Sequence, residues 1–222
     1  MTTRDKIISA AIKNFLTFGY EKTSLASIAE EVGIKKPSIY HHFKNKEELF
    51  YVSLNHILES LKHKIKNSIN NSSTSKEMLE SLISTLIEFH IQLSYIVNKN
   101  NFKLINMFCM LYSTVDNSEK TKKAVNDYYD FLKDIIMDIL STGQMKHELR
   151  KDIKKDSISE QIIAWFEGLL TFSSLYSSFN INTAKQDFLD NIWKLLSDQS
   201  KPKKSFFGRR SHPKTISLGT KW

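Results

Sequence analysis

The chain has 222 residues, a net charge of +8 and one cysteine, Cys109. This length allows one domain or two small ones with an ordinary core, and a single cysteine excludes a disulfide-stapled secreted scaffold. The first 20 residues lack the apolar stretch of a secretory signal. The most apolar segment, residues 162–179, is interrupted by Glu167 and by serine and threonine, so we expect a cytoplasmic protein without a membrane span.

The positive charge lies mostly at the two ends of the chain. Residues 201–222 carry seven lysines and arginines and no acid, while residues 1–66 carry eleven basic and seven acidic side chains. A basic N-terminal third favours a polyanionic partner, and a solvated charged face is the alternative. The last segment, 201–222, predicts a basic, disordered tail or a cloning remnant. Its alternative is an arm that adds non-specific DNA affinity.

Helical spacing of apolar residues begins at the N-terminus, and glycine and proline are scarce. Thr2 and Asp5 predict a capped helix start, and Gly19 predicts its end. A short second helix is expected between Ser24, as the N-cap, and Gly33, as the stop.

A third short helix is predicted from about Lys36, because Pro37 fits the first turn of a helix. Asn45 then caps a long helix that runs to about Ile69, with Glu48 at the reciprocal capping position. Both features are local, so they place these boundaries without reference to the rest of the fold.

The remaining chain also predicts helices. One opens at Thr74 and Glu77, and others cover residues 102–112, 118–140, 156–179 and 183–197, with 143–155 as a charged connector. The expected fold is all-α with about nine helices. We expect the chain to divide into residues 1–47, residues 48–200 and the tail in 201–222.

Two short helices joined by a glycine turn are the skeleton of a helix-turn-helix. The first buries an apolar face, and Ile34 and Ile39 fill the angle between the two. The second then presents short or basic side chains outward, where a major groove would lie. This outward set is Lys36, Pro37, Ser38 and His41.

Phosphate contacts are expected at helix N-termini, where backbone N–H groups point outward. Thr23 and Ser24 lie at the start of the second helix, and Lys46 lies at the start of the fourth. These residues therefore predict the backbone contacts that fix the register on DNA.

The segment TSLASIAEEVGIKKPSIYHHFKNKEELF, residues 23–50, resembles the DNA-binding signature of the TetR family of bacterial transcriptional regulators. The resemblance covers about residues 5–55 and implies a helix-turn-helix from Ser24 to Phe43. It implies a DNA-binding domain in residues 1–47 and an effector-binding and dimerisation domain in residues 48–200. It implies phosphate contacts from Tyr40 and Lys46 and base contacts from the outward set. Ala26 stands where some relatives carry a base-reading arginine, so readout is expected to rest on the helix that begins near Lys36, and the operator sequence is not predicted.

The middle of the chain is rich in aromatic residues and methionine, which build either a plain core or an adaptable apolar pocket. The resemblance favours a pocket for a small-molecule effector. The candidate lining residues are Leu61, Phe89, Met107, Phe108, Tyr112, Tyr128, Phe131, Trp165 and Phe166.

The segment from residue 161 to 197 is apolar on more than one face. One face can cover the body and the second needs a partner, although wholly internal packing is the alternative. The resemblance implies a four-helix interface between two subunits. The candidate interface residues are Trp165, Gly168, Phe172, Tyr176, Ile192, Trp193 and Leu196.

Other functional classes find little support. His56 and His63 are seven residues apart, which is too far for a helical metal chelate, and no catalytic or cofactor fingerprint is present, so we expect no enzyme, metal or cofactor. The predicted function is a homodimeric repressor on a palindromic double-stranded operator, released by a small, largely apolar ligand. The alternative is an activator, or a DNA-binding protein without an effector.

Overall fold

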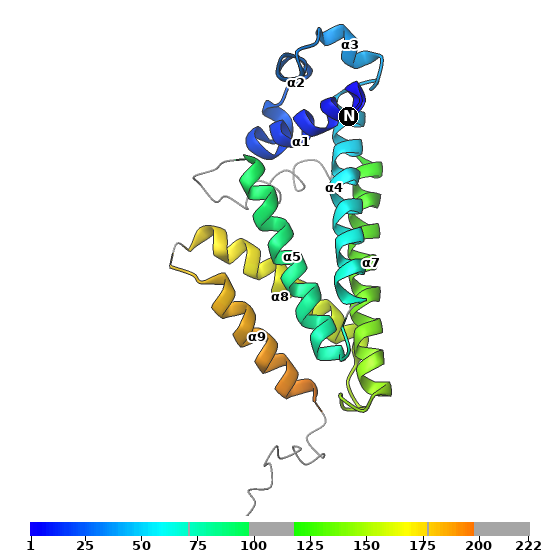
Figure 1. Cartoon of the computed structure of the whole chain (residues 1–222), viewed down its shortest axis with the longest axis vertical. Helices are drawn as coiled ribbons and strands as arrows, with labels where there is room; N and C mark the ends of the chain where they lie inside the picture. Colours follow the sequence, from blue (N-terminus) through cyan, green and yellow to red (C-terminus); the bar gives the residue numbers. More distant parts are fainter. Residues whose placement is uncertain (71, 98–117, 177, 198–222) are drawn as a thin grey trace, which may run out of the picture.

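The computed structural model describes residues 1–70, 72–97, 118–176 and 178–197, and all regular elements in these ranges are helices (Figure 1). The described helices are α1 Thr3–Lys22, α2 Leu25–Val32, α3 Lys36–Tyr40, α4 Lys46–Ile69, α5 Ser75–Val97, α7 Glu119–Met145, α8 Lys155–Leu175 and α9 Ile181–Leu196. The all-α prediction is confirmed. The expected helix at 102–112 and the tail at 201–222 lie outside the described residues.

Helices α1, α2 and α3 form a unit at one end of the molecule, where α1 packs on α2 and on the start of α4 (Figure 1). The predicted cap of Thr2 with Asp5 is present at the start of α1. Gly19, predicted to end α1, adopts φ 79° and interrupts the helix. One further turn follows to Lys22, so the predicted end is three residues early.

The long helix α4 runs from this unit down into the body, where it packs against α5 and α7 (Figure 1). Asn45 caps it by accepting a hydrogen bond from the Glu48 backbone N–H at 2.8 Å. The Glu48 carboxylate accepts from the Lys44 N–H at 2.6 Å, one residue earlier than the predicted reciprocal cap. The observed N-cap, Asn45, and the observed last residue, Ile69, match the boundaries predicted for this helix.

The body consists of α5, α7, α8 and α9, with α5 between α4 and α9 in Figure 1. Thr74 and Glu77 form the predicted reciprocal cap at the start of α5. Helix α7 continues through Gly143, which the sequence predicted to begin a connector. A Cβ on Gly143 would lie 2.5 Å from the Ser75 hydroxyl, so this glycine permits close packing inside a helix.

The end of α7 is tied to the start of α5. Glu148 accepts hydrogen bonds from both the backbone N–H of Ser75, at 2.8 Å, and its hydroxyl. Helix α8 ends at Leu175, four residues before its predicted end. No helix within the described ranges is long and apolar enough to cross a membrane.

Candidate nucleic-acid interface and ligand cavity

The turn between α2 and α3 is fixed by capping at both ends of α2. The Ser24 hydroxyl accepts from the Ser27 N–H at 3.0 Å, and Gly33 closes the helix in the left-handed conformation at φ 76°. The Gly33 N–H points back to the carbonyls of Ala29 and Glu30. A Cβ on Gly33 would meet nothing within 4 Å, so the requirement for glycine there is conformational.

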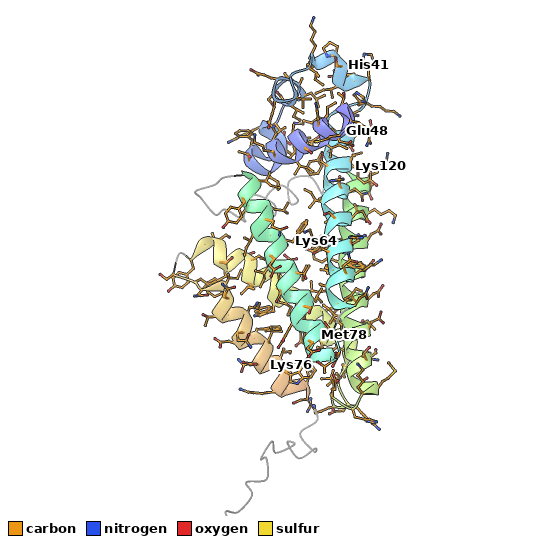
Figure 2. The ribbon with its side chains drawn as sticks, in the orientation of Figure 1. His41, Glu48, Lys64, Lys76, Met78 and Lys120 are labelled. Atoms are coloured by element: carbon orange, nitrogen blue, oxygen red, sulfur yellow. The ribbon has the colours of Figure 1, made fainter. Side chains whose placement is uncertain are left out.

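Helix α3 is held by one buried side chain and exposes the others. Ile39 is fully buried and Ser38 is half-buried. Figure 2 shows His41 at the end of the molecule, beyond α1. We call the outward set together with the exposed Tyr40 the recognition surface, which thus consists of Lys36, Pro37, Ser38, Tyr40 and His41.

The recognition surface lies in a basic environment. Lys35 and Lys44 flank α3 in sequence and are exposed, as is Lys36 within it. The Arg4 guanidinium lies 5.1 Å from the centre of the Phe43 ring, a cation–π distance, at the end of the turn after α3. Clustered cations beside a protruding helix favour contact with a polyanion.

Two predicted phosphate ligands point inward. The Thr23 side chain is 2% exposed, and its hydroxyl donates to the Gly19 carbonyl at 2.8 Å. The Lys46 ammonium donates to the carbonyls of Tyr20, at 2.9 Å, and Thr23, at 3.2 Å, and lies 4.2 Å from the centre of the Tyr20 ring. These bonds tie the end of α1 to the start of α4. Phosphate contacts by these side chains would have to replace them.

A small cavity lies in the body where α4, α5, α7 and α8 meet, with a volume of about 30 Å³. Helix α4 supplies an aliphatic wall, α5 and α7 supply mostly aromatic groups, and α8 supplies one carboxyl. The described lining residues are Leu54, Ile57, Leu58, Leu61, Phe89, His90, Val125, Tyr128, Tyr129 and Glu167.

Glu167 is the acidic group of this cavity. Its Oε1 accepts a hydrogen bond from the Tyr129 hydroxyl at 3.1 Å, whereas its buried Oε2 has no hydrogen-bond partner in the described structure. Burial raises the pKa of Glu167 to about 7, and the hydrogen bond from Tyr129 opposes this shift only in part. Burial also raises the pKa of Tyr129, as does the neighbouring Glu167. The tyrosine therefore stays a neutral donor.

His90 is the basic group of the cavity, but it is held neutral. The residue is 4% exposed, and its Nδ1 lies 2.7 Å from the Leu86 carbonyl. Because a carbonyl only accepts, Nδ1 carries the proton and Nε2 is the acceptor nitrogen. Burial lowers the pKa of His90 to about 4. The ring packs edge-on against Phe166, with centroids 5.6 Å apart.

The predicted effector residues are only partly brought together. Leu61, Phe89 and Tyr128 line the cavity, and Phe166 contacts the ring of His90 without being part of the lining. Met107, Phe108 and Tyr112 are outside the described residues.

Two other candidates lie elsewhere in the structure. Phe131 lies beneath the ammonium groups of Lys62 and Lys66, and Trp165 stacks on Phe188 with centroids 3.6 Å apart. Neither side chain is part of the described cavity lining.

The polar centre of the cavity was not predicted. Neither His90 nor Tyr129 was among the candidate effector residues. Glu167 gave a usable signal, because it is an acid in the middle of the apolar run 162–179. A charged residue in a helix that must bury most of its surface needs either a partner or a function. No cluster of histidine, cysteine or acidic residues suited to a metal is found in the described parts of the chain.

The predicted interface residues separate into exposed and internal groups. On α8, Gly168 is exposed, Phe172 and Tyr176 are each 52% exposed, and the neighbouring Leu175 is 68% exposed. We call these four residues the α8 apolar face. On α9, Ile192 and Trp193 are half-buried, whereas Leu196 is fully buried and belongs to the hydrophobic core of the chain.

Residues 7–51 match a protein family described as bacterial regulatory proteins, tetR family. The chain is also similar to the biofilm operon icaADBC HTH-type negative transcriptional regulator IcaR. The protein from Staphylococcus aureus is 26% identical over 196 residues, which is 87% of this chain and 97% of that protein. Its counterpart from Staphylococcus epidermidis is 47% identical over 51 residues, 23% of this chain and 28% of that protein.

Solved structures share the fold over most of the chain. A TetR transcriptional regulator from Chloroflexus aurantiacus superposes with a TM-score of 0.74 at 18% identity, covering 88% of this chain and 96% of that one. A putative transcriptional regulator from Saccharomonospora viridis in complex with choline gives a TM-score of 0.73 at 18% identity, covering 88% and 98%. At this identity the likeness concerns the fold alone.

Proposed function

Because the chain belongs to the TetR family of bacterial transcriptional regulators, we propose that it is a homodimeric repressor that a small molecule releases from a palindromic operator. The observation that carries the proposal is the recognition surface, an exposed basic helix held by Ile39 behind a glycine turn. Similarity to a negative regulator over 87% of the chain supports repression rather than activation.

DNA binding is proposed to combine base and backbone contacts. Lys36, Ser38 and His41 face bases from the major groove, while Tyr40 and the start of α2 at Ser24 contact phosphates. The two-fold axis of a dimer is mirrored by an operator with two half-sites about one helical turn apart.

This function is tested by selecting bound sequences from a random DNA pool and placing the preferred site upstream of a reporter gene. We expect a palindrome, and lower reporter expression when the protein is present. His41→Ala should change which bases are preferred, whereas Tyr40→Phe should weaken binding to all sequences alike. Equal losses on every sequence for the His41 variant would count against base readout there, and raised expression would indicate an activator.

Dimerisation is proposed to use the α8 apolar face. Phe172 contacts Tyr176 and Phe179 within the subunit, with ring centroids 5.4 and 5.1 Å apart, yet stays half exposed. Exposed aromatic and leucine side chains that are contiguous on one helix are typical of a protein–protein interface. A second copy of the chain is the partner that the two-fold operator requires.

Release by an effector is proposed to involve the cavity between α4, α5, α7 and α8. Helix α4 lines the cavity with Leu54, Ile57, Leu58 and Leu61 and also begins inside the DNA-binding unit. A ligand that pushes this wall can therefore alter the position of α3. The choline complex of the structural relative from Saccharomonospora viridis supports the presence of a ligand site in this fold.

A further inference from the structure

The cavity contains one acidic oxygen that the protein leaves without a partner. Glu167 Oε2 is buried and accepts no hydrogen bond in the described structure, while Oε1 takes the single bond from Tyr129. A buried carboxylate with half of its acceptor capacity unused is costly to maintain for stability alone. It is therefore a candidate for recognising a ligand.

The described walls hold nothing that neutralises this carboxylate. Helix α4 contributes only leucine and isoleucine, α5 contributes Phe89 and the neutral His90, and α7 contributes Val125 and two tyrosines. No lysine or arginine is among the described lining residues. The described lining thus offers one negative charge and no positive one, which disfavours an anionic ligand and favours a cation.

We propose that the effector of this protein is an organic cation, an amine or quaternary ammonium with an apolar body, whose positive charge lies against Glu167. The inference deepens the proposed release mechanism by naming the chemical class of its ligand. Aromatic faces add to the attraction, because Phe89, Tyr128 and Tyr129 line the same space as the carboxylate and cations bind well over such rings.

The size of the cavity determines how such a ligand acts. A volume of about 30 Å³ holds a water molecule or two, which is less than any organic ammonium needs. Binding therefore requires a wall to move. Because the aliphatic wall from α4 lines the same space as the carboxyl on α8, we expect the apolar body of the ligand to press on α4.

Ligand binding is expected to depend on pH through Glu167. Of the described groups that face it, His90 is already neutral above about pH 4 and both tyrosines have raised pKa values. Among these described groups of the cavity, Glu167, with a pKa of about 7, is the one that titrates between pH 6 and 8. A cation needs the ionised carboxylate, so its affinity should rise by about tenfold from pH 6 to pH 8.

The test is calorimetric titration of the full chain, without DNA, with choline, tetraethylammonium and benzyltrimethylammonium. These cations do not titrate themselves, and 3,3-dimethylbutan-1-ol is the uncharged analogue of choline. We expect at least one cation to bind more tightly at pH 8 than at pH 6. Glu167→Gln keeps the hydrogen-bond acceptor for Tyr129 but removes the charge. It should lower the affinity for that cation at least tenfold and abolish the pH dependence of the affinity.

The matched control is Glu88→Gln, which removes the same charge from an exposed position on α5 and should leave the affinity unchanged. The proposal is overturned if no cation binds, if the alcohol binds as tightly as choline, or if the Glu167 variant binds the cation as the parent does. Since the titration contains no DNA, any of these results leaves the DNA-binding proposal standing. Failure to select an operator would, in turn, leave the cation site standing.

Discussion

At the scale of single residues, Lys46 shows how a side chain predicted to contact DNA can have a second role inside the fold. Its sequence position, at the start of α4, predicts a phosphate contact. In the structure its ammonium is shared between the carbonyls of Tyr20 and Thr23 and the Tyr20 ring. The residue therefore positions the DNA-binding unit on α4.

Replacing Lys46 by methionine distinguishes a role in holding α1 against α4 from a role in binding phosphate. We expect the free energy of unfolding to fall by about 1–2 kcal/mol, because a charged group loses its hydrogen bonds to carbonyls. Binding to all DNA should weaken without a change in salt dependence. Lys36→Met, at an exposed position proposed to face bases, is the control: it should spare stability and change which bases are preferred. A reduction of the salt slope by about 0.9 for Lys46→Met, with unchanged stability, would show that Lys46 is a phosphate ligand.

Two buried groups of the cavity give opposite pH dependences of stability. Glu167 has its pKa raised to about 7 in the folded chain, so the folded state binds more protons and stability falls as pH rises from about 4.5 to 7. His90 has its pKa lowered to about 4, so the unfolded state binds more protons and stability rises from about pH 4 to 6.5. In the window they share, the two effects oppose each other.

Glu167→Gln should remove the Glu167 contribution to the pH dependence of stability and leave that of His90. The stability gained by the variant over the parent is expected to grow from pH 5 to about pH 7 and then level off, since glutamine has no charge to desolvate. Denaturant unfolding of both proteins at several pH values measures this difference directly. A difference that is constant across pH 5 to 8 would mean that Glu167 ionises at its ordinary pKa.

At the scale of elements, helix starts were predicted well because capping is local. The caps at Thr2, Ser24, Asn45 and Thr74 all appear where the sequence placed them. Features that depend on tertiary packing were missed. Gly143 reads as a helix stop, but its role is to let α7 approach Ser75, which no local pattern reveals.

The same distinction applies to the candidate sites. The recognition surface lies within one short segment, so its residues could be predicted together. The cavity draws single residues from four helices, and its acid and its tyrosine donor, Glu167 and Tyr129, are 38 positions apart. Spacing in sequence carries no information about that pair.

Helix α8 provides a direct test of the proposed dimer. A Cβ built on Gly168 meets nothing within 4 Å, so an arginine there should not disturb the subunit itself. We expect the parent to sediment as a dimer and Gly168→Arg to sediment as a folded monomer with poor operator affinity, because half of the contacts are lost. Asn126→Arg, on the exposed side of α7, adds the same side chain away from α8 and should stay dimeric. A dimeric Gly168→Arg protein would place the interface elsewhere.

At the scale of the whole molecule, the DNA-binding unit is linked to the body by more than one helix. Helix α4 is one of these connections. The structure also places α1 against α5, and it places the first turn of α7 beside the first turn of α4, where Figure 2 shows Lys120 near Glu48. Helices α4, α5 and α7 all line the cavity. A change in the cavity can therefore reach the recognition surface through any of the three.

Coupling through these helices must be reciprocal. A ligand can shift the protein between DNA-binding and released states only by its difference in affinity for the two. A hundredfold loss of operator affinity requires a difference of about 2.7 kcal/mol. Saturating operator should then weaken ligand binding by the same hundredfold, because the coupling free energy belongs to both sites.

Titrating the ligand with and without operator DNA measures this factor. A short DNA of unrelated sequence, which leaves the ligand affinity nearly unchanged, is the control. Equal ligand affinities with and without operator would show that the bound molecule has no part in release from DNA.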